Sequence, residues 1–230
     1  MIMVGPLAGR GRCGSCLMVA TMAIAVATSG TAADAPPASD YEKVIAGRAE
    51  KILATLDPPT DGSRERVRES LLDFSRATNA WHETHGPRRK ELKSAQDEES
   101  KAELAAAETE LATIRGEFVA RLAADLSPVQ VEKVKDGLTY NVLHVTERAY
   151  HEMIETLTGE QKAKIHDWLV EARDLAISEG SSEAKHGVFG KYKGRINNYL
   201  SQQGYDLKQE ERGWQARRKA AATSTTPESK

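Results

Sequence analysis

Apolar residues recur at every third or fourth position along most of this sequence, a spacing that places them on one face of a helix. The clearest case is the stretch 186–202, where Lys191, Arg195 and Asn198 share a second, polar face. No stretch alternates convincingly with the period of two that marks a β-strand. The sequence therefore predicts an all-α fold. The apolar positions of this stretch are Val188, Phe189, Tyr192, Ile196, Tyr199 and Leu200.

Two glycines, Gly190 and Gly194, fall on a third face of the same predicted helix. A glycine inside a helix costs about 1 kcal/mol relative to alanine. The usual compensation is the close approach of another backbone or of a ligand. We therefore predict that both glycines face a close neighbour and that Gly194→Ala is destabilising.

The whole domain is predicted to form a multi-helix bundle, and its first half to contain a long antiparallel helical hairpin. A first helix begins near Asp40, and the segment 57–62 ends it because its two prolines cannot join a helix interior. Residues 88–124 are rich in Ala, Glu, Lys and Leu and carry only a narrow apolar seam. This pattern is typical of long packed helices, so we predict two of them as a hairpin over about 63–125. We place the turn at 95–100. The alternative is one long protruding helix.

Two segments with the pattern Leu-Ser/Thr-x-x-Gln indicate helix starts, at 126–130 and 157–161. In each, the hydroxyl can cap a backbone N–H three residues on, and the Gln side chain can reach back to the cap N–H. Between them, 136–144 has no clear period. We expect an ordered loop there and a helix over 146–157.

The first 33 residues have the order of a secretory signal peptide: two arginines, an apolar run over about 17–27, and small residues up to Ala33. The run is shorter than the roughly 20 residues of a membrane span. We therefore expect cleavage after Ala33, with Ala35 as the alternative, and a periplasmic or secreted protein. A linker at 34–39, a single all-α domain at 40–218 and a disordered tail at 219–230 should follow.

Charge and cysteine usage narrow the classes of function. Without the signal peptide, the chain has 30 basic and 34 acidic residues, a net charge of about −4. Nucleic-acid binding usually needs a strongly basic domain, so we exclude it. No later apolar stretch is long enough for a membrane span. Cys13 and Cys16 leave with the signal peptide, so stability cannot rest on disulfides.

The polar face of the 186–202 helix is the candidate ligand-binding surface. Its cations suit carboxylate, sulfate or phosphate groups, since arginine can grip an anion through two bonds. Tyrosine rings would offer flat surfaces to sugars. The irregular 136–144 segment can converge on the same place, because loops on a rigid scaffold often carry function. The alternative is core tyrosines and solvated cations. The candidates are Lys191, Tyr192, Arg195, Asn198, His186, Tyr140, Asn141 and His144.

Motifs for metals and for known catalytic machinery are missing from the sequence. His82 and His85 lie one helical turn apart, but no third ligand is fixed by spacing. We interpret them as part of a solvated helix face. Neither a Gly-x-Ser-x-Gly motif nor a phosphate loop occurs. We therefore predict no metal and no cofactor.

The C-terminal third contains several distinctive segments: Ser181-Ser-Glu, Lys185-His, the run from Phe189 to Leu200, and Gln203-Gly-Tyr-Asp-Leu207. Through these segments it resembles a domain-of-unknown-function family of exported bacterial proteins. A weaker likeness extends from Tyr41 to Arg218. The resemblance implies export and no established activity. The paired capping segments also resemble those of periplasmic Spy/CpxP-like chaperones, which are all-helical.

Three functions are compatible with these features. The first is an exported helical module that binds an acidic glycan or another exported protein through the helix around 186–202. The second is a lyase-like enzyme on acidic polysaccharide, in which a cation neutralises a uronate and a base takes the proton alpha to it. The third is a periplasmic stress chaperone. Whether the protein is an enzyme is left open by the sequence.

Overall fold

The protein is described here from a computed structural model, for residues 40–56 and 60–224. Over these residues the fold consists of eight α-helices without a β-strand, so the all-α prediction is confirmed. The predicted signal peptide and linker lie outside the described residues. The helices are α1 Asp40–Leu53, α2 Asp61–Leu92, α3 Glu98–Asp125, α4 Pro128–Leu138, α5 Val142–Met153, α6 Gly159–Ala176, α7 Ser182–Gln202 and α8 Leu207–Ser224.

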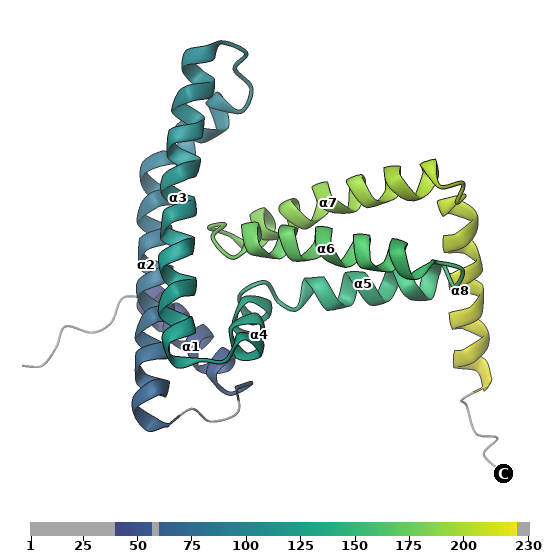
Figure 1. Ribbon diagram of the computed structural model, residues 1–230, viewed down its shortest axis with the longest axis horizontal. Coiled ribbons are helices and arrows are strands. Elements are labelled where there is room, and N and C mark those ends of the chain that lie inside the picture. The colour runs from purple at the N-terminus through teal and green to yellow at the C-terminus, as the bar shows by residue number, and fades with distance from the viewer. Residues whose placement is uncertain (1–39, 57–59, 225–230) are drawn as a thin grey trace, which may run out of the picture. The chain divides into compact units, whose positions relative to one another are not determined.

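Helices α2 and α3 form the long antiparallel hairpin (Figure 1). The chain reverses at 93–97, so the segment is a hairpin and not one protruding helix. Helix α2 continues through Pro87 to Leu92. The rings of Phe74 and Phe118 stack between the two helices, with centroids 4.0 Å apart. Burial of these aromatic rings is a main source of stability at this contact.

A first hydrophobic cluster joins this hairpin to α1 and α4. Ile45, Ile52 and Leu53 bury one face of α1, and Val134 and Leu138 bury one face of α4. Leu122 of α3 and Leu71 of α2 belong to the same cluster. The three-four spacing of these positions is the reason that each short helix has one apolar face to bury.

A second hydrophobic cluster is built from α5, α6, α7 and the start of α8. Phe189, Ile196 and Leu200 of α7 are buried in it, and Val188, Tyr192 and Tyr199 are partly buried against it. The apolar face predicted for this helix is therefore confirmed. The two tyrosines belong to the edge of the core.

Both predicted capping boxes are present at the starts of α4 and α6. The hydroxyl of Ser127 accepts from the N–H of Gln130, and that of Thr158 accepts from the N–H of Gln161. In both boxes the glutamine side chain also reaches back to the backbone N–H of the cap. Such boxes satisfy N–H groups that a helix start would otherwise leave without a partner.

Three details differ from the sequence-based expectations. A methyl group built on Gly190 or Gly194 would meet no atom within 4 Å, so the predicted close contact is wrong. The irregular segment expected at 136–144 is reduced to 139–141, because α4 and α5 continue on either side. Helix α8 runs to Ser224, through the first residues of the predicted tail, and 225–230 lie outside the described residues.

None of the helices within 40–56 and 60–224 combines the length and the apolar character that a membrane span requires.

Candidate functional site

The turn between α4 and α5 has an unusual backbone. Tyr140 and Asn141 have φ angles of 57° and 62°, in the left-handed region that residues with a side chain rarely adopt. For most residues with a side chain this conformation costs roughly 1–2 kcal/mol, and Asn adopts it more readily than Tyr. Two consecutive residues with a left-handed backbone persist only where surrounding contacts hold them. Strained backbone of this type is frequent at functional sites.

Backbone hydrogen bonds hold the turn from one side. The carbonyl oxygen of Asp136 accepts from the N–H of Asn141 at 2.9 Å and from the N–H of Thr139 at 3.1 Å. The hydroxyl of the fully buried Thr139 donates to the carbonyl oxygen of Lys135 at 2.9 Å. The last turn of α4 therefore fixes the path of the chain into α5.

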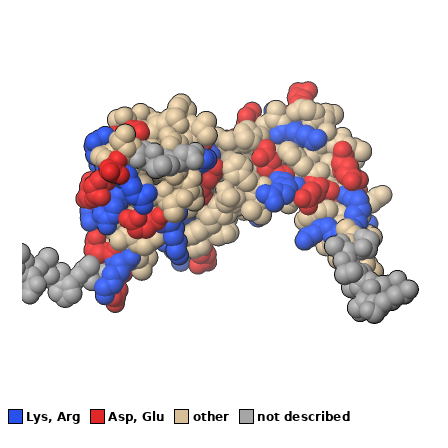
Figure 2. Space-filling view, turned by 90° about the horizontal axis from the view of Figure 1, so that it is seen from below, with Lys and Arg blue, Asp and Glu red and all other residues tan. Residues whose placement is uncertain are grey.

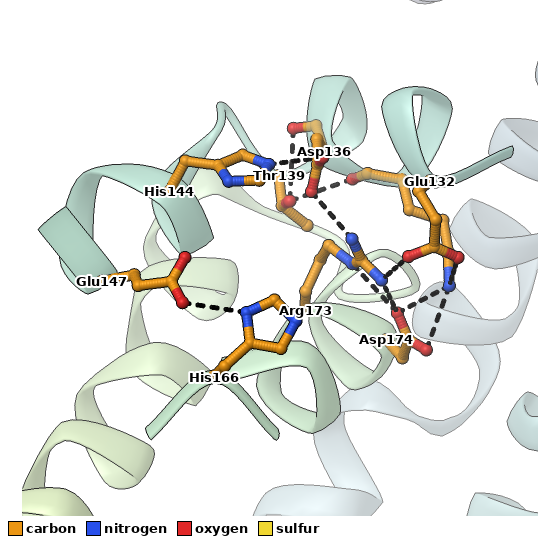
Figure 3. Close-up of polar contacts among 9 residues, drawn as sticks. Glu132, Asp136, Thr139, His144, Glu147, His166, Arg173 and Asp174 are labelled. Atoms are coloured by element: carbon orange, nitrogen blue, oxygen red, sulfur yellow. Dashed lines mark hydrogen bonds and ion pairs between the residues drawn. The ribbon is translucent and has the colours of Figure 1, made fainter. Parts of the chain in front are cut away.

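Side-chain ion pairs hold the same turn from the other side (Figure 3). The guanidinium of Arg173, which is 3% exposed, donates to the Asp136 carboxylate at 3.0 Å. It also pairs with Glu132 and with Asp174. His144 contacts the other oxygen of Asp136 at 2.8 Å. Asp136 thus joins α4, α5 and α6.

A second cation, Lys135, completes this network. Its ammonium, on a side chain that is 8% exposed, lies 2.7 Å from Glu132 and 3.1 Å from Asp174. Burial alone would lower the pKa of Arg173, but the Asp136 hydrogen bond and the surrounding carboxylates raise it above its ordinary value. Each buried cation therefore has carboxylate partners that offset the cost of its burial.

The turn that these contacts hold leaves the Tyr140 ring exposed to solvent. The residue is 44% exposed. Its ring lies nearly parallel to that of His186, with centroids 6.0 Å apart and planes 19° from parallel. His186 belongs to the first turns of α7, where its Nδ1 lies 2.8 Å from the carbonyl oxygen of Ser182. The structure therefore brings together two of the predicted site residues from distant parts of the sequence.

A groove runs between α1 and this turn. We call it the Tyr140 groove and define it by Lys43, Gly47, Arg48, Lys51 and Tyr140, around a volume of 560 Å³. Lys43 pairs with Asp40. Among the described residues, neither Arg48 nor Lys51 has a hydrogen bond or ion pair. The groove therefore offers positive charge that the fold itself does not neutralise.

An adjoining cavity lies deeper, between α1, α2 and the α6–α7 connection. We call it the Arg48 cavity and define it by Tyr41, Arg48, Asn79, Glu179 and Lys185, around a volume of 340 Å³. The two hollows adjoin because Arg48 lines both of them. Both volumes fall within the range of about 300–1,000 Å³ that is usual for ligand pockets.

Lys185 is the most deeply buried charged side chain of the cavity, at 5% exposed. Its ammonium donates to the carbonyl oxygens of Ala176 and Ile177, at 3.2 Å and 2.8 Å, at the C-terminal end of α6. Burial, and then the charge of Arg48, lower the pKa of Lys185 to about 8. A lysine in this state can exchange a proton near neutral pH.

Glu179, the carboxylate that lines the Arg48 cavity, is already paired with Arg89. Both oxygens of Glu179 accept from the guanidinium of Arg89, each at 3.0 Å. Burial would raise the pKa of Glu179, but these hydrogen bonds outweigh it and hold the pKa below its ordinary value. Because Glu179 is bound to Arg89, it leaves the charge of Arg48 available to a ligand.

The excess of positive charge is local. On the face shown in Figure 2, Lys and Arg side chains are interspersed with Asp and Glu. This agrees with the nearly balanced composition of the sequence. A ligand would therefore be selected by individual unpaired cations and not by the field of a basic face.

The other predicted site residues lie outside both hollows. Arg195 pairs with Glu171 at 3.4 Å and lies over the Trp168 ring, 4.6 Å from its centroid. Lys191 and Asn198 are exposed on the same helix. The polar face of α7 thus holds its arginine in contacts within the protein.

Three further candidates have local roles. Burial, and next a hydrogen bond with Glu171, raise the pKa of Tyr192 to about 12. Asn141 is the N-cap residue of α5 but makes no side-chain capping bond. His144 lies within α5 and is directed at Asp136 (Figure 3). Of the predicted set, Tyr140 lines the groove, and His186 contacts its ring from α7.

Sequence reasoning missed Arg48 and Lys185, although a signal was present. Arg48 lies three or four residues from Val44, Ile45 and Ile52, on the side of α1 that otherwise carries apolar residues. Lys185 precedes Phe189 by four residues, on the buried face of α7. A cation at an apolar position of a helical repeat is costly to bury and indicates a specific partner or a function.

Comparison with known protein families identifies the family of this chain. A family model described as "Protein of unknown function (DUF3826)" matches residues 42–220, which include Arg48, Tyr140 and Lys185. No curated protein matches the chain. The likeness to Spy/CpxP-like chaperones stays a prediction. The match covers most of the chain and confirms the predicted membership of a domain-of-unknown-function family: the chain belongs to the DUF3826 family.

Proposed function

We propose that this protein is exported and binds a carboxylate-bearing glycan in the Arg48 cavity and the Tyr140 groove. The observation that carries the proposal is the unpaired guanidinium of Arg48, which lines both hollows. Export is supported by the charge and apolar pattern of the first 33 residues. The proposed ligand surface is thus the α1 side of the cavity, in place of the outer face of α7.

A carboxylate is the group that suits Arg48 best. A guanidinium presents paired N–H donors whose geometry matches the two oxygens of a carboxylate. The residue is half-buried, so the attraction is screened less than at an open surface. Lys51 lies one helical turn further along the groove and adds a second unpaired cation. Two cations in a row suit a ligand with repeated negative charges.

A sugar ring is the group that suits Tyr140 best. The exposed tyrosine ring provides a flat apolar surface beside the cations. Its backbone is fixed by Asp136 and Thr139, so little conformational freedom is lost when a ligand binds. An aromatic platform next to an arginine therefore supports an acidic saccharide over a small inorganic anion.

Calorimetric titration with an oligouronide and with a neutral oligosaccharide of the same length tests the proposal. We expect binding of the oligouronide only. Arg48→Gln should weaken it at least tenfold, the scale of one hydrogen-bonded charge pair. Arg195→Gln is the matched control, since that arginine is paired with Glu171 outside both hollows. Loss of binding in Arg195→Gln with retention in Arg48→Gln would move the site to α7.

A further inference from the structure

We propose that Lys185 is the catalytic base that removes the proton alpha to the carboxylate of the bound glycan, so that the Arg48 cavity carries out β-elimination. The inference rests on the proposed function, because the carboxylate must first be bound by Arg48. It adds a reaction and a catalytic residue to what would otherwise be a binding site. Lys185 and Arg48 line the same cavity, from α7 and α1 respectively.

The hydrogen bonds of Lys185 leave one position of its nitrogen for proton transfer. The nitrogen of a lysine carries three protons when charged and two when neutral. Two N–H groups are occupied by the carbonyl oxygens of Ala176 and Ile177. The third tetrahedral position holds either a proton or a lone pair. Lys185 can therefore gain or lose one proton without breaking either hydrogen bond.

The groups around Lys185 favour its neutral form. Tyr41 and Arg48 of α1 and Glu179 of the α6–α7 connection are the titratable groups that line the cavity with it. Helix α2 contributes Ser75, Thr78 and Asn79, which carry no charge. Burial of Lys185 opposes its protonation most, and the positive charge of Arg48 opposes it next. Glu179 favours protonation, but Arg89 already holds that carboxylate. A base poised close to neutral pH is the most effective one in general acid–base catalysis.

The proposed step balances with the groups present. Arg48 neutralises the carboxylate and stabilises the negative charge that develops when the adjacent C–H bond breaks. The proton moves to the nitrogen of Lys185, a carbon–carbon double bond forms, and the bond from the β-carbon to the glycosidic oxygen breaks. The leaving oxygen then takes the proton back from Lys185. No oxidant, reductant or other co-reactant is consumed.

Deuterium exchange measures the first half of this step directly. The full chain is incubated with an oligouronide in deuterated water, and incorporation at the carbon alpha to the carboxylate is followed by nuclear magnetic resonance. The double bond is followed in parallel by ultraviolet absorbance. We expect both signals with the unaltered protein, and an increase of the rate as the pH rises towards about 8.

Lys185→Gln is the informative variant, because its amide keeps two N–H donors but has no basic nitrogen. We expect oligouronide binding within about threefold of the unaltered protein and a loss of turnover of at least about a hundredfold. Lys191→Gln is the matched control on the same helix, because Lys191 is exposed and lies outside both hollows. Circular dichroism establishes that each variant is folded.

The outcomes separate this inference from the proposed function. Binding of the oligouronide without exchange and without a double bond would overturn the role of Lys185 and leave the binding function intact. Full turnover in Lys185→Gln would do the same. Absence of binding by the unaltered protein would overturn both. If Lys185→Gln unfolds, Lys185→Arg replaces it; this variant keeps the charge and the N–H donors but titrates far above neutral pH.

Discussion

Arg173 of α6 donates to Asp136 of α4 at 3.0 Å, and this buried ion pair supports the turn that displays Tyr140. Removal of one partner would leave a buried carboxylate without its charge partner. We therefore expect Arg173→Met to lower the free energy of unfolding by about 3–5 kcal/mol. Denaturant titration measures this change. Arg195→Met should cost at most about 1 kcal/mol, because its pair with Glu171 is 53% exposed on both sides.

A comparable loss of unfolding free energy in Arg173→Met and Arg195→Met would contradict the prediction that the buried ion pair contributes more than the exposed one. A loss in Arg173→Met of less than 1 kcal/mol would mean that water reaches the network and screens it. The oligouronide affinity of a folded Arg173→Met protein gives a second measurement. We expect it to fall, because the Tyr140 turn loses one of its two supports.

The fold could largely be predicted from the sequence, because its signals are local. The capping boxes at Ser127 and Thr158 each depend on residues three positions apart, and the apolar face of α7 follows from the helical period. Local interactions of this kind do not depend on the rest of the chain. Both features can therefore be predicted without any tertiary contact.

The site could be predicted only in part, because its contacts join distant segments. Arg173 and Asp136 are 37 positions apart, and neither residue alone indicates the pair. Tyr140 can be predicted as a candidate because its segment lacks a helical period, and its backbone is left-handed. The predicted close contact at Gly190 and Gly194 is wrong, because a glycine at an open surface and a glycine in a close contact look the same in a sequence.

The strain at Tyr140 can be measured with a pair of variants. Tyr140→Ala and Tyr140→Gly both remove the ring, but only glycine adopts a positive φ without a steric cost. We expect the glycine variant to be more stable by about 1 kcal/mol. Val145 provides the control, since it is 60% exposed inside α5. There the order should reverse, with glycine less stable than alanine by about 1 kcal/mol.

The measurement is the denaturant midpoint of all four variants. The midpoints report stability if the slope of the unfolding free energy against denaturant concentration is the same in each variant. The same order at both positions would show that Tyr140 is not strained. Both Tyr140 variants should also lose oligouronide affinity equally, since the ring and not the backbone is proposed to contact the ligand. Unequal losses would assign part of the effect to the turn itself.

Alanine at two helical glycines should have opposite effects. Gly194→Ala adds a methyl group where no atom lies within 4 Å, so it should stabilise by up to about 1 kcal/mol. Gly137→Ala would place its methyl carbon 2.8 Å from Cγ1 of the buried Ile52. We expect a loss of about 1–3 kcal/mol from this overpacking. Thermal melts of both variants test the prediction, and a destabilised Gly194→Ala would restore the close contact expected from the sequence.

The pH dependence of stability tests the environment of Lys185. The pKa of its ammonium is about 8 in the folded protein and about 10.4 in an unfolded chain. Between these values the unfolded chain binds more protons, so the contribution of Lys185 to the free energy of unfolding rises with pH. The destabilisation is fully present below the folded pKa and is relieved above it.

We therefore compare the unaltered protein with Lys185→Gln from about pH 7 to about pH 9.5. The difference in unfolding free energy should shift by about 2 kcal/mol in favour of the unaltered protein. A difference that stays constant over this range would mean that Lys185 remains charged, and the neutral amine required of a base would then not form near neutral pH.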